Sequence, residues 1–166
     1  MQINTEVLVD APAEKAWQII GEKFGDFGEW TTALDSSFLK GTLGVGAIRV
    51  CHTRSVGLFP PAIVEEQLID FDPKHHRYTY IVTKGMPSMF KKAQNSWSIE
   101  SISQTSCIIH SHVVLELKLW LRPFSWLLTM LLKRDMKKFF AEMAYFIEYG
   151  KVHPRKAKSS PEPVKT

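Results

Sequence analysis

The chain has 166 residues, of which 45% are hydrophobic and 23% are charged. This length and composition are typical of one globular domain with a single buried core, and they exclude a chain that is disordered throughout. The net charge of +4 belongs to the C-terminal segment, because residues 150–166 hold five basic side chains and one acidic one, which leaves 16 of each sign elsewhere. A neutral body argues against a dedicated nucleic-acid surface.

Residues 150–166 are rich in Pro, Ser and Lys and have no apolar period, so we predict a basic, disordered tail. Such a tail keeps a protein soluble or makes weak contact with an anionic membrane surface. The N-terminus lacks the basic start of a signal peptide. The most apolar stretch, residues 119–132, is interrupted by Arg122 and Pro123 and is too short to span a bilayer. We therefore expect a cytoplasmic protein without a transmembrane segment.

In chain order, the alternation of residues 2–10 predicts a strand. Pro12 and Glu14 then mark the start of a helix whose apolar face includes Trp17 and Phe24, and residues 26–30 suit a second short helical turn. Further strands are predicted at residues 37–40, 47–53, 62–71, 77–83, 93–101 and 106–121, separated by turns. Because short connections favour antiparallel neighbours, we predict one seven-stranded antiparallel sheet.

A long helix is predicted at residues 124–149, after Pro123 ends the last strand. From Met136 onward its apolar residues form one stripe at steps of three and four. Residues 126–132 are apolar nearly all the way round, and such turns need a loop, a partner chain or a ligand to cover them. No internal linker appears, so residues 1–149 are predicted to form one domain.

Three sequence segments, in the order in which they occur, resemble a known superfamily. They are VDAPAEKAW at residues 9–17, GVGAIRV at 44–50 and VEEQLIDFDPKHHRYTYIV at 64–82. With the long terminal helix, they resemble the START-like (SRPBCC) superfamily, which includes polyketide cyclases, birch-pollen-allergen-like proteins and abscisic-acid receptors. The resemblance implies an α+β helix-grip fold, in which a curved sheet wraps the terminal helix and encloses an apolar cavity. It implies a hydrophobic ligand such as a lipid, isoprenoid or polyketide-like aromatic, and no cofactor.

Glu66 is the most informative polar residue. If Val64 and Leu68 face inward, Glu66 does too, because strand residues two apart share a face. A carboxylate inside an apolar cavity is able to hydrogen-bond a ligand or act as a general base. The alternative is a glutamate that pairs with Arg49 or lies on the solvent face beside Glu65.

Alternation and the resemblance together predict the residues that line the cavity, which are Cys51, Thr53, Leu58, Phe59, Glu66, Tyr78, Tyr80, Val82, Asn95, Trp97, Leu127 and Met130. The competing interpretation is that these side chains only pack on the terminal helix as core. The loop at residues 57–61 resembles the gate loop of the abscisic-acid receptors, and residues 85–89 would face it. The chain lacks the receptors' His-Arg-Leu latch and their ligand-holding lysine, so a hormone-receptor role is not implied.

His110 and His112 stand two residues apart, but no third ligand has suitable spacing, so no metal site is expected. The alternation of Val113 and Leu115 directs these histidines outward, whereas alignment with the receptor branch directs them inward. A β-bulge near Val113 would reconcile the two. The two cysteines, Cys51 and Cys107, are expected to be buried thiols.

The function expected from these features is binding or transport of a hydrophobic small molecule, without catalysis. One alternative is a cyclase or dehydratase in which Glu66 is the general base and Tyr80, Asn95 or a histidine assists. Another is a protein-interaction module that uses the apolar half of the terminal helix. The sequence leaves the ligand and the oligomeric state open.

Overall fold

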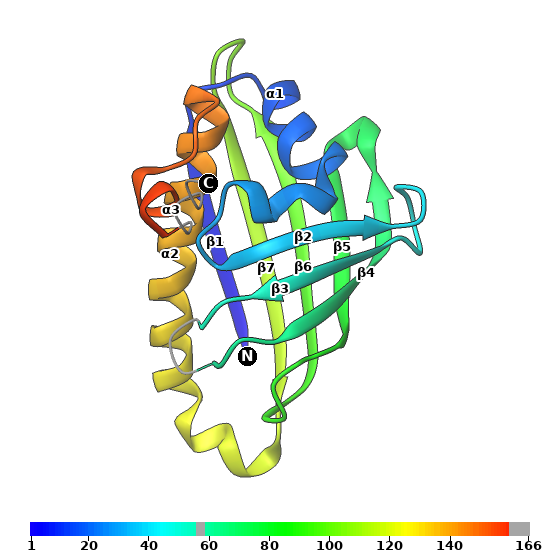
Figure 1. Cartoon of the computed structure of the whole chain (residues 1–166), viewed down its shortest axis with the longest axis vertical. Coiled ribbons are helices and arrows are strands. Elements are labelled where there is room, and N and C mark those ends of the chain that lie inside the picture. The colour runs from blue at the N-terminus through cyan, green and yellow to red at the C-terminus, as the bar shows by residue number, and fades with distance from the viewer. Residues whose placement is uncertain (56–58, 160–166) are drawn as a thin grey trace, which may run out of the picture.

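The computed structural model describes residues 1–55 and 59–159. Seven antiparallel strands form one sheet in the order β1-β7-β6-β5-β4-β3-β2. Their bounds are β1 Gln2–Val9, β2 Leu34–Lys40, β3 Ile48–Thr53, β4 Ile63–Asp72, β5 Arg77–Lys84, β6 Phe90–Ser101 and β7 Cys107–Leu117. The sheet curves strongly, so that β2 and β3 pass across β6 and β7 in Figure 1.

The longest helix, α2 at Ser125–Tyr149, runs beside β1 and closes the open side of the curved sheet (Figure 1). Short helical elements fill the connections: α1 Ala13–Trp17, η1 Gln18–Glu22, η2 Phe24–Glu29, η3 Pro73–His75, η4 Leu119–Phe124 and α3 Pro154–Ser159. The predicted α+β helix-grip fold is therefore confirmed. Within the described ranges, no helix is long and apolar enough to cross a membrane.

Two glycines allow close approaches that shape the fold. Gly28 in η2 lies against the backbone of β2, where a Cβ would come within 2.6 Å of the Ser37 nitrogen. Gly85, at φ +74°, begins the turn from β5 to β6, and a Cβ there would collide with the Ile63 carbonyl. Glycine is required at both places because any larger residue would push the elements apart.

The interior has two parts. The part nearest α1 and η2 is a packed aromatic core built around Trp17, Phe24, Trp30, Tyr78 and Trp97. The other part, which we call the mouth cluster, contains the buried residues Phe90, Leu115, Leu117 and Leu128, with Phe59, Met86, Met89 and Leu132 packed against them. Between these two clusters lies a space that the side chains do not fill completely.

β2 and β6 begin three residues earlier than expected, at Leu34 and Phe90, and two larger differences concern the C-terminal part of the chain. The last strand ends at Leu117 instead of residue 121, because Lys118 donates its backbone N–H to Met89 O and the chain then turns into η4 around Pro123. Within the segment expected to be a disordered tail, residues 154–159 form the short helix α3. Lys156 of α3 is buried and donates a hydrogen bond to Leu34 O at 2.7 Å, which fixes the helix to β2. Residues 160–166 lie outside the described ranges.

Candidate functional site

An apolar cavity of about 350 Å³ lies between the curved sheet and α2. We call it the inner cavity. Its volume falls within the range typical of small-molecule sites. It is lined by Ile3, Phe59, Val64, Glu66, Tyr80, Val82, Met86, Pro87, Phe90, Ala93, Gln94, Asn95, Trp97, Val113, Leu115, Leu132, Met136, Phe139 and Phe140.

Glu66 reaches the cavity because it shares the inner face of β4 with Val64 and with the buried Leu68. The predicted parity of the strand is therefore correct. Glu65, on the other face, pairs instead with Lys40 at 3.1 Å and Lys84 at 3.0 Å. The two carboxylates lie on opposite faces because successive residues of a strand alternate; the pairing of β4 with β5 also shifts register between Glu65 and Glu66.

The Glu66 carboxylate is held by Arg49, its register partner on β3. Arg49 contacts Oε2 through Nε at 2.7 Å and through Nη2 at 2.6 Å, and the Cys51 thiol lies 3.4 Å from the same oxygen. These contacts with described residues all go through Oε2, so Oε1 remains for a ligand in the cavity. The two interpretations of Glu66, a partner of Arg49 and a cavity residue, are therefore both correct.

Arg49 is itself enclosed by aromatic rings. Its Cζ lies 4.0 Å from the centroid of Phe24 and 4.1 Å from that of Phe27, and its Nη1 donates to Phe24 O at 2.9 Å. Burial alone lowers the pKa of the guanidinium, but the Glu66 carboxylate together with the nearby Cys51, Tyr80 and Tyr78 outweighs burial, so that pKa lies above its ordinary value. The charged pair is thus fixed at the boundary between the aromatic core and the inner cavity.

A second polar group in the cavity wall comes from β5, β6 and β7. Asn95 Nδ2 donates to the Tyr80 hydroxyl at 3.4 Å, and Ser111 Oγ donates to Asn95 Oδ1 at 2.9 Å. Burial, followed by the nearby Glu66 charge, raises the pKa of Tyr80 above its usual value of 10.0. Tyr80 therefore stays protonated and neutral near pH 7 and offers a hydroxyl to a ligand.

Trp97 lines the inner cavity and holds a buried, unpaired donor. The ring is buried and stacks on Phe140 at 5.4 Å, and in the described part of the chain its Nε1–H has no hydrogen-bond partner. A buried N–H without a partner costs about 1–3 kcal/mol.

Residues 1–146 match a family model described as polyketide cyclase/dehydrase and lipid transport. The chain belongs to this family. Among curated proteins, no match was found.

Solved structures share the fold of this family member at low sequence identity. A START superfamily protein from Mycobacterium smegmatis aligns with a TM-score of 0.73 at 14% identity, covering 90% of this chain and 99% of that chain. XoxI from Bacillus cereus gives a TM-score of 0.72 at 14% identity, with 92% and 99% covered. A norcoclaurine synthase point mutant from Thalictrum flavum gives 0.65 at 18% identity, with 89% and 93% covered. These likenesses establish the START-like fold.

Within this family fold, half of the predicted site residues come together at the inner cavity: Phe59, Glu66, Tyr80, Val82, Asn95 and Trp97. Three others lie beside it. Cys51 is buried behind Glu66, Tyr78 belongs to the aromatic core, and the Thr53 hydroxyl donates to Ala62 O at 3.1 Å across the connection between β3 and β4. Leu58 lies outside the described residues.

Leu127 and Met130 were predicted to line the cavity, but they lie on the outer side of α2, where Met130 is 55% exposed. On a helix of 3.6 residues per turn, Leu128 and Leu132 face the sheet, so Leu127 and Met130 point away from it. The all-round apolar composition of these turns gave no signal for which side would be inside.

Several residues of the cavity wall were not predicted from the sequence. Met136, Phe139 and Phe140 belong to the apolar stripe of α2, which we interpreted as packing only. Met86 and Phe90 come from the connection between β5 and β6 and the start of β6. The stripe could have predicted these wall residues, because a helix that packs on a curved sheet also forms one wall of any space left between helix and sheet.

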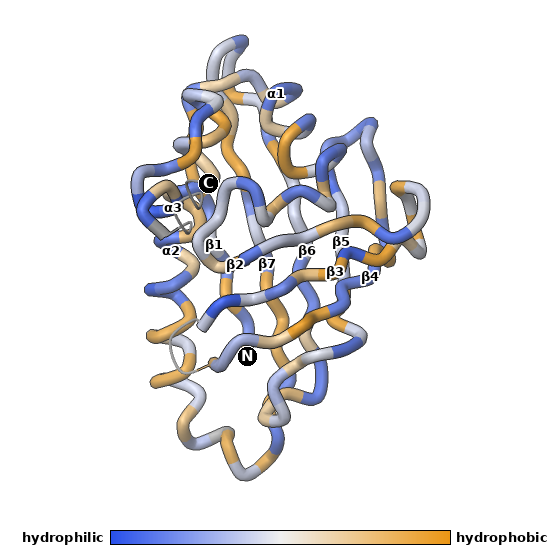
Figure 2. The backbone as a smooth tube through the Cα atoms, in the orientation of Figure 1, coloured by the Kyte–Doolittle hydropathy of each residue, from blue (hydrophilic) through white to orange (hydrophobic). Residues whose placement is uncertain are grey.

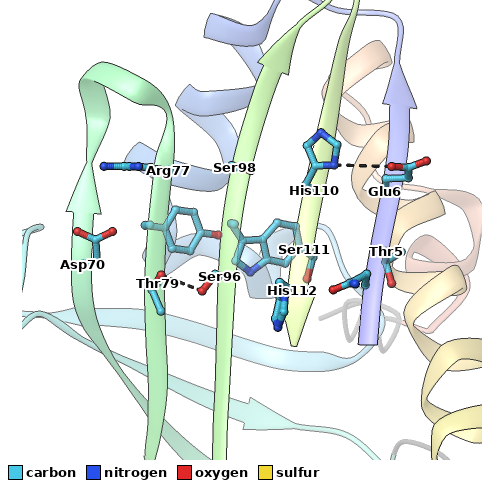
Figure 3. Close-up of a pocket in the computed structure, with 13 residues that line it drawn as sticks. Thr5, Glu6, Asp70, Arg77, Thr79, Ser96, Ser98, His110, Ser111 and His112 are labelled. Carbon is cyan, nitrogen blue, oxygen red and sulfur yellow. Dashed lines mark hydrogen bonds and ion pairs between the residues drawn. The ribbon is translucent and has the colours of Figure 1, made fainter. Parts of the chain in front are cut away.

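A larger hollow of about 710 Å³ lies on the opposite, outer face of the sheet, and Figure 3 shows its side chains. We call it the outer groove. Short side chains such as Ser96, Ser98 and Thr79 form its floor, between the longer Glu6 and Arg77. Its lining is polar, and within the described ranges no further element covers it. The outer groove therefore does not suit an apolar ligand.

His110 and His112 both project into the outer groove (Figure 3). The alternation of β7 thus predicted their direction correctly, and the inward direction implied by the receptor alignment was wrong. The register with β1 and β6 runs without a shift from Cys107 to Val114, so no bulge reverses the strand there. His110 Nδ1 lies 3.7 Å from Glu6 Oε2, and its Nε2 lies 3.5 Å from Glu100 Oε2. Across the residues the structure describes, no group of three or more ligating side chains suits a metal ion.

Proposed function

We propose that the chain binds a small hydrophobic molecule in the inner cavity and does not transform it. The observation that carries this proposal is a cavity of about 350 Å³ with an almost wholly apolar wall and a few polar groups, Glu66, Tyr80, Asn95 and Trp97, on one side of it. Apolar walls with a few placed polar groups are the usual construction of a small-molecule site. The family, which includes lipid transport, supports the same conclusion.

The size of the cavity favours a compact ligand. An apolar cavity of about 150 Å³ holds one benzene molecule. The 350 Å³ of the inner cavity would accommodate a molecule roughly twice as large, such as a bicyclic aromatic or a short isoprenoid. Glu66 Oε1 would accept a hydrogen bond from a ligand hydroxyl or amine, and the Tyr80 hydroxyl would bond a ligand oxygen.

A cyclase or dehydratase is the second candidate, because Glu66 and Tyr80 line the same cavity. Binding is favoured over catalysis for two reasons. The Glu66 oxygen that Arg49 occupies is not free to take a proton, and Tyr80 stays protonated because burial raises its pKa. General acid–base catalysis works best with groups that titrate near the working pH, and Tyr80 does not.

Occupancy of the cavity is tested with the neutral fluorophore N-phenyl-1-naphthylamine. We expect the wild-type protein to bind it, and Ala93→Trp to bind it at least about tenfold more weakly, because the indole fills the cavity. Val82→Phe is a second substitution that fills the cavity with a smaller ring, and it is used if Ala93→Trp does not fold. Ser98→Trp is the matched control, since it adds the same ring to the outer face of the same strand.

Native mass spectrometry of protein purified from its own host should reveal a co-purifying apolar molecule. A folded wild-type protein that carries no ligand and does not bind the fluorophore would contradict the proposal. Equal fluorophore binding by Ala93→Trp and Ser98→Trp would also contradict it. A recovered ligand that turns over to a product lacking one water would favour the dehydratase instead.

A further inference from the structure

A cluster of large apolar side chains is exposed at one end of the molecule. We call it the apolar tip, and it consists of Leu119, Trp120, Phe124, Trp126, Leu127 and Met130. Trp120 is 70% exposed and Trp126 is 67% exposed. The tip comprises η4 and the first turns of α2, which form the end of the molecule farthest from α1 in Figure 1. Figure 2 shows hydrophobic residues recurring along this segment.

The tip is exposed because the sheet ends before it. β7 stops at Leu117, and α2 turns only Leu128 and Leu132 toward the mouth cluster. The tip residues on the other side of these helix turns have no sheet to pack on. A soluble protein rarely exposes a contiguous group of two tryptophans, a phenylalanine and aliphatic side chains unless that group contacts something.

Along the segment of sequence that forms the tip, the charged residues are all of one sign. Between Glu116 and Asp135 the sequence contains four basic residues, Lys118, Arg122, Lys133 and Arg134, and no acidic residue. Lys133 and Arg134 are exposed on the turn of α2 that follows the tip. This local excess stands apart from the neutral average of the domain.

Indole rings with flanking lysines and arginines match the chemistry of a lipid-water interface. Tryptophan favours the headgroup level of a bilayer, and basic side chains are attracted to anionic headgroups. A second copy of this chain fits less well. A two-fold interface would bring four positive charges of one copy against the same four of the other, with no acid between them.

We propose that the apolar tip docks the protein on the surface of an anionic lipid bilayer. Trp120 and Trp126 enter the interface, and Lys133 and Arg134 contact the headgroups. The mouth cluster lies at the same end, and its Phe59, Met86 and Leu132 also line the inner cavity. Docking would thus place the cavity beside the apolar phase. The docking surface is separate from the cavity and stands whether or not the cavity holds a ligand.

Vesicle binding tests this proposal. The full chain is mixed with vesicles of phosphatidylcholine containing roughly 30% phosphatidylserine, and its tryptophan emission and co-sedimentation are measured. Trp17, Trp30 and Trp97 are already buried, so a blue shift on adding vesicles reports Trp120 and Trp126. We expect a blue shift and co-sedimentation. Binding should be weaker without phosphatidylserine, and weaker in about 0.5 M salt.

Two variants locate the surface. Trp120→Ala/Trp126→Ala and Lys133→Glu/Arg134→Glu should each bind the anionic vesicles at least about tenfold more weakly. Leu8→Ala/Ile102→Ala is the apolar control, because both residues are exposed at the opposite end of the molecule. Lys151→Glu/Lys158→Glu is the charge control, and it also tests contact through the basic C-terminal segment. Both controls should bind like the wild type.

Circular dichroism melts establish that each variant is folded, as expected for changes at exposed positions. Three results would overturn the proposal. The first is a wild-type protein that does not bind the anionic vesicles. The second is binding that Lys151→Glu/Lys158→Glu abolishes while the tip variants retain it. The third is a dimer seen by light scattering without lipid that Trp120→Ala/Trp126→Ala dissociates, which would assign the tip to a second copy.

Discussion

At the scale of single residues, the unusual feature is a charged pair placed between an aromatic core and an apolar cavity. Arg49 is 2% exposed, and its contacts include two carboxylate bonds, one backbone carbonyl and two ring faces. A buried ion pair contributes little net stability, but removal of one member leaves an uncompensated charge. The pair therefore fixes where Glu66 points more than it stabilises the fold.

This interpretation gives a stability prediction. Glu66→Ala should lower the free energy of unfolding by about 3 kcal/mol, because Arg49 would remain buried without its partner. The double variant Arg49→Met/Glu66→Leu should recover most of that loss and lie within about 1 kcal/mol of the wild type. Urea unfolding of the three proteins measures both values.

Glu65→Ala is the matched control for this cycle, since the neighbouring glutamate pairs only with exposed lysines. Its loss should stay below about 1 kcal/mol. If Glu66→Ala and Glu65→Ala cost the same, the charge of Arg49 is not held by Glu66 in solution.

The thiol of Cys51 makes stability depend on alkaline pH. Burial, followed by the Glu66 charge, raises the pKa of Cys51 from 9.0 to about 12. The stabilisation that comes from this raised pKa is fully present below pH 9. It is lost as the pH rises toward 12, because the unfolded chain releases a proton that the folded chain keeps.

Each such group lowers the free energy of unfolding by at most about 1.4 kcal/mol per pH unit. Cys51→Ala should therefore lose stability less steeply than the wild type between pH 9 and 10, and by less than this limit. Above that range Tyr78 and Tyr80, whose pKa values burial also raises, act in the same direction in both proteins. Urea unfolding at a series of pH values gives the slopes, and identical slopes would contradict an inaccessible, protonated Cys51.

At the scale of elements, α2 is fixed at its C-terminal half by polar contacts that its apolar stripe did not predict. Glu142 is 1% exposed and accepts hydrogen bonds from Thr31 Oγ1 at 3.1 Å and from Thr32 N at 2.8 Å. These bonds join α2 to the connection between η2 and β2. The N-terminal half, by contrast, has one face on the mouth cluster and the other exposed, and its Thr129 hydroxyl donates to Met1 Sδ at 2.8 Å.

The contact of α3 with β2 should contribute measurably to stability. Lys156→Ala removes a buried hydrogen bond from a charged donor, and we expect a loss of about 1.5–3 kcal/mol in urea unfolding. Lys158→Ala, on an exposed position of the same short helix, should change stability by less than about 0.5 kcal/mol. Equal effects of the two substitutions would mean that α3 does not stay docked on Leu34 in solution.

At the scale of the whole molecule, its two ends differ in how they are filled. Aromatic rings from α1, η2, β5 and β6 fill one end and leave no space for a ligand. At the other end, Ala93 and Val82 are too small to meet α2, so the inner cavity remains. The mouth and the apolar tip lie at this hollow end. The proposed binding and docking surfaces are thus both confined to the half of the molecule that packs least completely.

Much of this arrangement could be predicted from the sequence, and the failures share one cause. The alternation of β4 and β7 favoured an inward Glu66 and an outward His110, because strand parity is a local property, and the structure has both so, although the sequence alone left each of them open. Leu127 and Met130 were placed inside wrongly, because apolar residues surround those helix turns and only the position of the sheet decides which side is covered. The helical segment α3 was missed because its stability comes from Lys156 docking on β2 and not from its own composition.

The sequence by itself determined the order and type of the main elements and the antiparallel sheet, and it favoured one facing for its strands. These follow from short-range periodicity and from turn residues that act within a few positions. Only the tertiary structure decided that Arg49 holds Glu66, that six of the twelve predicted site residues share one cavity, and that the tip residues are exposed. Each of these depends on how far the sheet curves and where it ends beneath α2. That curvature is set by packing among residues far apart in the chain.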